Sequence, residues 1–120
     1  MKTEELKALV IEAAEELKAK EITELNVTEL TDMTDVMLII TGTSSRHLKA
    51  VAGNITETVK KKGLQPVGVE GEDSGEWVLV DLGDIIVHVM LPEIRDFYDL
   101  ERLWTARPSD SDAENENDEE

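Results

Sequence analysis

Apolar residues near the start of the chain recur at steps of three and four, the spacing that places side chains on one face of an α-helix. The members of this stripe are Leu6, Leu9, Val10, Ala13, Ala14 and Leu17. The spacing predicts an amphipathic helix from Thr3 to about Lys20. Thr3 can serve as its N-cap, and Lys18 and Lys20 suit the negative end of the helix dipole.

The pattern then changes from the helical period to patterns typical of strands. Leu25 and Val27 alternate with polar residues, as in a half-buried strand. Turn-forming residues follow at 31–35. The nearly unbroken apolar run Val36–Thr41 predicts a strand that is covered on both faces.

A second helix is predicted between Gly42 and Gly63. Ser44 or Ser45 can cap its start, and three lysines followed by a glycine are typical of a helix C-terminus. Its apolar positions again lie three and four residues apart, at Leu48, Val51, Ala52, Ile55 and Val59.

Strand patterns return in the last third of the chain. A short strand is expected at 66–69, followed by a loop of glycine and acidic residues at 71–75. Two further strands, Trp77–Asp81 and 84–91, are joined through Leu82 and Gly83, which is a tight hairpin signal. Pro92 is typical of the first residue of a helix.

This order of elements predicts the fold class. The final helix is expected to break near Asp99, which can recap a last turn through Trp104. The order α-β-β-α-β-β-β-α suggests one α/β domain over residues 1–106, with a mixed sheet of about five strands flanked by helices. The connection through the central helix is long enough for a right-handed parallel crossover. Residues 107–120 are expected to form a disordered, solvated acidic tail.

Charge changes the picture of what the chain can bind. The 28 acidic and 12 basic residues give a net charge of −16, and without residues 109–120 the chain still carries −9. Such a field repels phosphate backbones, so no direct nucleic-acid readout is expected. An acidic domain instead suits a basic protein partner.

Other classes are excluded by what the sequence lacks. There is no cysteine, which removes disulfides, thiolate metal sites and cysteine nucleophiles. No apolar run approaches the roughly 20 residues of a membrane-spanning helix, and no signal peptide is apparent at Met1. We therefore expect a cytoplasmic protein that does not bind membranes.

Three groups of polar residues are candidates for sites of chemistry. The segment 42–47 can hold a phosphate at a helix start, but serine capping explains it as well and is favoured. Asp81 and Asp84 can bind a divalent metal, yet their spacing across a turn favours turn-forming aspartates. His88, in the middle of a strand, is more often a hydrogen-bonded structural residue than a base, and an interface histidine is the other interpretation.

The aromatic residues indicate a recognition surface. Of the four Phe, Tyr and Trp residues, three lie within 84–104: Phe97, Tyr98 and Trp104. Aromatics and arginine are the residue types that anchor protein interfaces. We expect Phe97 and Trp104 to pack the helix on the sheet and Tyr98 to face a partner. Trp77 either completes the core or belongs to the surface of Tyr98.

Together, several segments resemble one known family. They are Asp35 before an apolar strand, TGTSSRHLKAVA at 41–52, and GEWVLVDLGDIIVHVMLPEIRDFYDLERLW at 75–104. The chain resembles the ribosomal silencing factor family, also called Iojap-like or RsfS, from Thr3 to Thr105. Some positions depart from the family pattern: Val36 and Met37 replace an aromatic pair, Leu82 replaces a tyrosine, and Met90 a phenylalanine.

The resemblance implies a function without catalysis. Family members bind the large ribosomal subunit through its ribosomal protein number fourteen and sterically block the small subunit, which represses translation under nutrient limitation. Their fold resembles nucleotidyltransferases without the catalytic acids, so no enzyme activity, cofactor or metal is expected. A role in large-subunit assembly and a metal-dependent nucleotidyltransferase using Asp81 and Asp84 are the alternatives.

The resemblance also places a contact surface. Its predicted residues are Trp77, His88, Pro92, Arg95, Asp96 and Tyr98. Arg95 and the acids are expected to form charge-assisted hydrogen bonds with the partner, with Tyr98 as a rigid anchor. The residues expected to hold the helix on the sheet are Phe97, Leu100, Leu103 and Trp104. Homodimerisation through related aromatic surfaces is a further hypothesis.

Overall fold

Five strands form one mixed sheet in the order β1-β2-β5-β4-β3. The structure, a computed structural model, describes residues 2–105, with side chains through residue 103. The strands are β1 Lys20–Asn26, β2 Val36–Thr41, β3 Gly68–Glu70, β4 Trp77–Asp81 and β5 Ile85–Met90. β2 and β5 pair in parallel, and all other neighbours are antiparallel. The predicted α/β fold with a mixed, five-stranded sheet is confirmed.

The connection from β2 through α2 to β3 passes over two other strands, which the sequence does not indicate. β2 and β3 run in the same direction, as a parallel crossover requires, but β5 and β4 lie between them. The parallel partner of β2 is the last strand, β5, with Val36 opposite Ile85 and Thr41 opposite Met90. The hairpin β4–β5 therefore fills the middle of the sheet.

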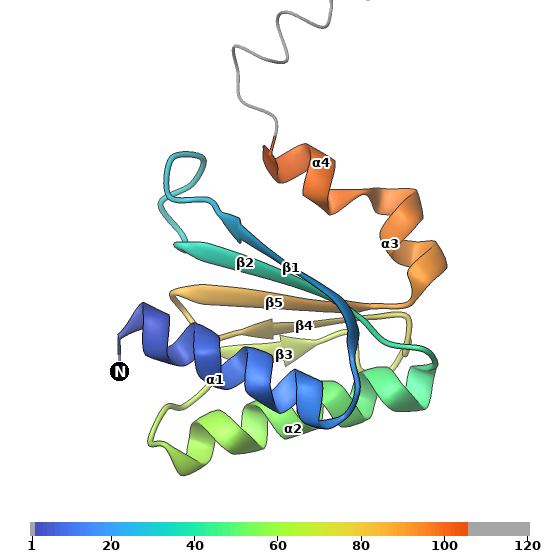
Figure 1. Ribbon diagram of the computed structural model, residues 1–120, viewed down its shortest axis with the longest axis horizontal. Helices are drawn as coiled ribbons and strands as arrows, with labels where there is room; N and C mark the ends of the chain where they lie inside the picture. Colours follow the sequence, from blue (N-terminus) through green and yellow to red (C-terminus); the bar gives the residue numbers. More distant parts are fainter. Residues whose placement is uncertain (1, 106–120) are drawn as a thin grey trace, which may run out of the picture.

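Helices α1 (Thr3–Glu16) and α2 (Ser45–Lys61) cover one face of the sheet (Figure 1). Between them and the sheet lies the main core, because alternate side chains of each strand point to the same face. The strand residues of this core are Val36, Leu38, Ile40, Val78, Val80, Ile85, Val87 and Val89. The helix residues include Leu6, Val10, Leu48, Val51, Ile55 and Val59.

The first helix begins at Thr3 as predicted, but its predicted C-terminal end and N-cap were wrong. The helix ends at Glu16 because the backbone at Lys18 turns into the left-handed region, with φ of 63°, and Lys20 already belongs to β1. The N-cap is Lys2 rather than Thr3, and the Lys2 backbone N–H donates to the Glu5 carboxylate at 3.0 Å.

The opposite face of the sheet carries a smaller apolar cluster. Its buried residues are Leu25, Val27, Met37, Ile39 and Met90, with Trp77, Ile94 and Leu100 half-buried against them. Helices α3 (Pro92–Tyr98) and α4 (Leu100–Thr105) follow β5 and lie apart from α1 and α2 (Figure 1). No helix in residues 2–105 is long and apolar enough to cross a bilayer.

The predicted break of the final helix is confirmed. Asp99 is the C-cap of α3 in the left-handed conformation, with φ of 49°, and its N–H donates to the carbonyl of Arg95. The break turns the chain between α3 and α4. The predicted tail at 107–120 and the side chain of Trp104 lie outside the described residues.

Candidate functional site

Four rings form a continuous row across α3, β4 and β5, which we call the aromatic row: Phe97, Tyr98, Trp77 and His88. The ring centroids of Phe97 and Tyr98 are 5.0 Å apart in an edge-to-face arrangement. Tyr98 and Trp77 are 4.9 Å apart, and Trp77 and His88 are 5.7 Å apart. These separations are those of favourable aromatic pairs. The row runs from an exposed ring, Phe97, to a buried one, His88.

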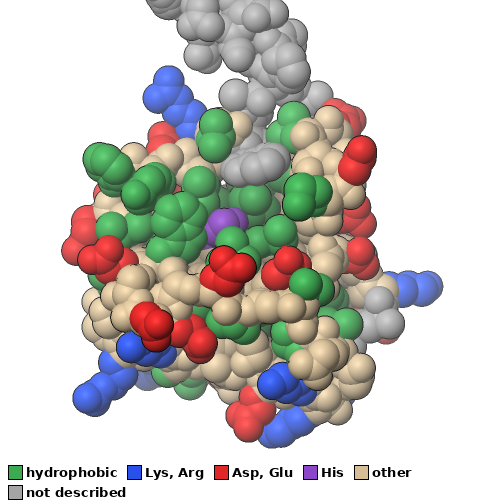
Figure 2. All heavy atoms as spheres, turned by 180° about the vertical axis from the view of Figure 1, so that it is seen from behind, with side chains coloured by type: hydrophobic (Ala, Val, Ile, Leu, Met, Phe, Trp, Pro, Cys, Tyr) green, Lys and Arg blue, Asp and Glu red, His purple; other side chains and the backbone are tan. Residues whose placement is uncertain are grey.

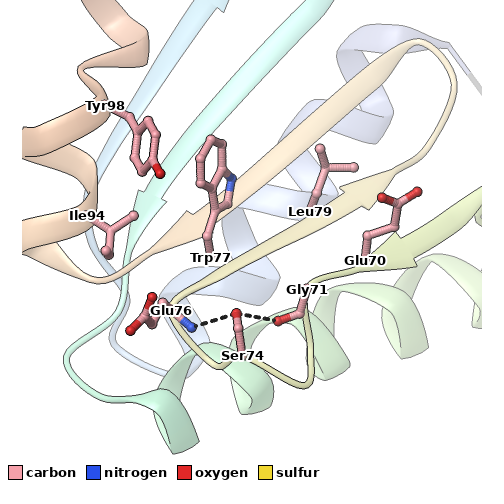
Figure 3. A pocket seen from close by; sticks show the side chains of 8 residues that line it. All are labelled: Glu70, Gly71, Ser74, Glu76, Trp77, Leu79, Ile94 and Tyr98. Carbon is pink, nitrogen blue, oxygen red and sulfur yellow. Dashed lines mark hydrogen bonds between the residues drawn. The ribbon is translucent and has the colours of Figure 1, made fainter.

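Trp77 begins β4, opposite Met90 of β5, and the loop before it holds it in place. Gly71 has φ of +88°, and a Cβ there would lie 2.1 Å from the carbonyl oxygen of Trp77. Only glycine tolerates both conditions. The Ser74 hydroxyl donates to the Gly71 carbonyl at 3.1 Å and accepts the Glu76 N–H at 3.3 Å (Figure 3). The loop is therefore folded against the start of the strand.

His88 occupies the centre of the sheet, between Leu79 of β4 and Ile39 of β2. The Trp77 indole N–H donates to its Nδ1 at 2.9 Å, so the neutral ring carries its proton on Nε2. Burial lowers the pKa of His88 to about 4. Nε2 is buried and has no hydrogen-bond partner within the described chain. The ring is therefore neutral at ordinary pH.

A groove of about 370 Å³ lies beside the aromatic row. Its lining residues are Glu70, Gly71, Ser74, Glu76, Trp77, Leu79, Ile94 and Tyr98. Tyr98 and Ile94 come from α3 and face Trp77 of β4, while Glu70 and Glu76 stand at the rim (Figure 3). The groove has apolar walls and carboxylates at its rim, a combination that suits a partner with both apolar and basic side chains.

The space-filling view shows the same character over a wider area. Seen from behind, hydrophobic side chains gather around a histidine, and acidic side chains border them (Figure 2). Tyr98 is 51% exposed and Phe97 is 79% exposed. Exposed aromatics grouped with apolar side chains are typical of protein-binding surfaces.

Arg95 differs from the expectation that it would contact a partner. It is 7% exposed, and all five of its N–H donors face acceptors of this chain. Nε and Nη2 donate to the two carboxylate oxygens of Glu101 at 2.8 and 3.0 Å. Nη1 donates to the Glu21 carbonyl and to the Thr41 hydroxyl, and Nη2 also donates to the Thr23 hydroxyl. Arg95 thus joins α3 to α4, β1 and β2.

The six predicted site residues divide into three groups. Trp77, His88 and Tyr98 contact one another in the aromatic row. Pro92 and Asp96 are exposed on α3. Arg95 lies on the buried side of that helix.

The prediction for the packing residues was wrong in part. Phe97 and Leu103 are exposed, at 79% and 66%, whereas Leu100 packs against the smaller apolar cluster as expected. A helical period counted from Leu91 would have predicted that Phe97 is exposed. Steps of three and four lead from there to Ile94, Arg95 and Tyr98, which leaves Phe97 on the outer side. The groove residues Glu70, Leu79 and Ile94 were also missed, because the pairing of β3 with β4 brings Glu70 beside Leu79 and the position of α3 adds Ile94.

Local hydrogen bonds settle the two weaker candidates. The Ser44 hydroxyl accepts the His47 N–H at 3.1 Å, so the predicted helix cap is confirmed. Asp81 accepts the Gly83 N–H at 2.9 Å, as a turn-forming aspartate does. Among residues 2–105, no group of three or more His, Cys, Asp or Glu side chains is placed to hold a metal.

Comparison with known proteins supports the resemblance. The family model described as "Ribosomal silencing factor during starvation" matches residues 1–120. A ribosomal silencing factor of Chromobacterium violaceum is 49% identical over 104 residues, which cover 87% of this chain and 85% of the relative. A crystal structure of a protein from the same organism superposes with a TM-score of 0.86 at 48% identity and covers 89% of each chain.

A more distant relative comes from an organelle. The mouse protein named "Mitochondrial assembly of ribosomal large subunit protein 1" is 40% identical over 95 residues, which cover 77% of this chain and 42% of that protein. The aromatic row and the groove thus lie in a fold that this chain shares with the silencing factors. The chain belongs to the family of ribosomal silencing factors during starvation.

Proposed function

We propose that this protein binds the large ribosomal subunit through its ribosomal protein number fourteen and thereby prevents the small subunit from joining. Translation would fall under nutrient limitation. The family supports a role in ribosome-associated regulation. The location of the protein in the cytoplasm stays a prediction.

The aromatic row beside the acid-rimmed groove carries this proposal. Tyr98 stands half-exposed on Trp77, and Phe97 extends the row into solvent. Such rigid aromatic rings bury a large area at little cost in side-chain entropy, which is why they dominate interface energetics. Glu70 and Glu76 at the groove rim, together with the net charge of −16, favour a basic partner.

The mechanism requires occupancy alone. A specific interface buries about 800 Å² on each partner, an area that a domain of this size can provide on one face. The remaining volume of the bound protein then excludes whatever would approach the same surface. No covalent step, cofactor or metal takes part in this scheme.

Sedimentation tests the proposal directly. Purified large and small subunits are combined with and without the protein and separated on a gradient. The expected result is that the protein travels with the large subunit and reduces the joined fraction. A protein that stays at the top of the gradient and leaves joining unchanged would contradict the proposal.

Two substitutions locate the surface. Tyr98→Ala removes the anchor, and Asp96→Lys reverses a charge on the exposed side of α3. Both are expected to weaken sedimentation with the large subunit while the fold is kept. Glu12→Lys is the matched control, because Glu12 is exposed on α1, on the other side of the sheet. Equal loss in the control would show that net charge, and not this surface, determines binding.

A role in large-subunit assembly is the second candidate function. It is favoured by the name of the mouse relative and needs the same docking surface. Accumulated large-subunit precursors in a deletion strain during growth would support assembly. Normal subunits together with continued translation in starved cells would support silencing.

A further inference from the structure

We propose that Arg95 is a positioning residue: it fixes α3 and α4 on the sheet so that Phe97 and Tyr98 stand ready for a partner. This inference rests on the proposed function and deepens it, because it explains how the anchor is oriented. Arg95 acts through its neighbours, since its donors face acceptors within the chain.

The ion pair between Arg95 and Glu101 closes a short segment of chain. The two residues flank Phe97, Tyr98 and Asp99, and the carboxylate receives two guanidinium N–H groups in a bidentate pair. Bidentate pairs define orientation as well as distance. The hydrogen bond from Arg95 also lowers the pKa of the Glu101 carboxyl, which keeps the pair ionised.

The remaining donors attach this segment to the sheet. The Thr23 hydroxyl on β1 and the Thr41 hydroxyl on β2 each lie 2.7 Å from a guanidinium nitrogen. The β1–β2 register shifts between Lys20 and Thr23, and Glu21 within this bulge has φ of 46°. A bulge leaves backbone groups outside the ladder, and Arg95 donates to the Glu21 carbonyl.

Left-handed backbone therefore occurs on both sides of the guanidinium. Glu21 lies in β1, to which Arg95 donates hydrogen bonds, and Asp99 joins α3 to α4. Non-glycine residues in this conformation are costly and persist where the surroundings determine them. The two strained positions thus lie in the elements that the guanidinium joins, β1 and the end of α3.

Apolar packing alone holds α3 and α4 weakly. The helices span 7 and 6 residues, which is too short for independent stability. Arg95 is the buried residue of α3, while Ile94 and Leu100 are half-buried and Phe97 and Tyr98 are exposed. The orientation of the exposed rings thus depends on the guanidinium contacts.

The test separates positioning from direct contact. Glu101→Ala frees two donors of Arg95, so a guanidinium that touched the partner would then bind equally well or better. Positioning predicts the opposite, a roughly tenfold weaker binding to isolated large subunits, because the anchor is no longer preorganised. Thr23→Val removes one acceptor of Arg95 and the 3.2 Å hydrogen bond from the Thr23 hydroxyl to Glu101, but it keeps the bidentate ion pair, so it is expected to weaken binding less.

A second readout does not involve the ribosome. Tyr98 lies 4.9 Å from the Trp77 ring, so its ring-proton NMR shifts report the contact. In Glu101→Ala these shifts should move toward those of a free tyrosine, under conditions where denaturation shows the domain to be folded. Lys7→Met is the control, because it breaks another ion pair, with Glu24 at 2.7 Å, on the far side of the sheet.

The outcomes are distinct. The positioning role is wrong if the Tyr98 ring-proton shifts do not move in Glu101→Ala. It is also wrong if these shifts move while binding to the large subunit stays the same. If the unmodified protein fails to bind large subunits, the proposed function fails, while the NMR comparison still decides whether Arg95 orients Tyr98.

Discussion

The indole N–H of Trp77 donates a 2.9 Å hydrogen bond to Nδ1 of His88, and this bond links the half-buried part of the aromatic row to its buried end. The two side chains come from neighbouring strands, where Trp77 pairs with Met90 and His88 with Leu79. Protonation of Nδ1 would place two donors opposite each other. The bond therefore requires a neutral histidine.

His88 makes the stability of the protein depend on pH. Its pKa is about 4 when folded, and in the unfolded chain the pKa is near the ordinary 6.5. The unfolded state thus binds more protons between these values, so the stabilisation is complete above pH 6.5 and is lost as pH falls to about 4. The full loss is roughly 3 kcal/mol.

Urea unfolding at several pH values checks this prediction. His88→Gln removes the titrating group, so the stability advantage of the unmodified protein over this variant should shrink on acidification. Subtracting the variant also removes contributions shared by both proteins, such as that of Glu101. A difference that stays constant from pH 7 to pH 4 would contradict the assignment.

Gly71 and Gly83 form a matched pair for testing the loop before Trp77. Both have φ of +88°, but a Cβ meets the Trp77 carbonyl only at Gly71, while Gly83 has nothing within 4 Å. Gly83→Ala is expected to cost about 1 kcal/mol from backbone strain alone. Gly71→Ala should cost roughly 2 kcal/mol more and shift the NMR resonance of the Trp77 indole N–H. Equal losses would mean that the loop adjusts freely.

Phe97 should affect binding and leave stability nearly unchanged. Its side chain is 79% exposed, so Phe97→Ala is expected to change the free energy of unfolding by no more than about 0.5 kcal/mol. Binding to the large subunit should weaken roughly fivefold or more if the ring belongs to the interface. Leu48→Ala, in the core, is the contrast, with an expected loss of about 2–5 kcal/mol. A stability loss of that size for Phe97→Ala would place its ring in the core.

Asp81 tests the nucleotidyltransferase alternative. Its carboxylate accepts the Gly83 N–H at 2.9 Å, and Asp81→Asn keeps an acceptor there. We expect this variant to be nearly as stable as the unmodified protein, and neither to bind nucleotide in a magnesium-dependent way. Calorimetric titration with nucleotide and magnesium measures this, and binding that is lost in Asp81→Asn would favour the enzyme.

The sequence predicts those parts of the fold in which one local signal acts alone. The run Val36–Thr41 matches β2 to the residue, and the Ser44 cap and the break at Asp99 follow from local chemistry. The end of α1 does not follow from one local signal. The apolar stripe continues to Leu17, but the turn into β1 needs left-handed backbone at Lys18, which no residue type there signals.

Residue type singled out only part of the candidate site, and its geometry could not be predicted from the sequence. Tyr98 and Trp77 could be singled out by residue type, yet their contact depends on the pairing of β4 with β5 and on how α3 is held. Arg95 shows the limit most clearly. Its acceptors lie up to 74 positions away in the sequence, so a charge expected to face a partner is used within the fold.

The central place of β5 has a consequence for how the protein is made. The ribosome synthesises β5 last of all the strands, yet β5 joins the pair β1–β2 to the pair β4–β3. Two-stranded pieces are at best marginally stable in water, so the sheet cannot form before residue 90 has left the exit tunnel. Folding is thus expected to occur after nearly the whole domain has been synthesised, in a single late step dominated by contacts between distant parts of the chain.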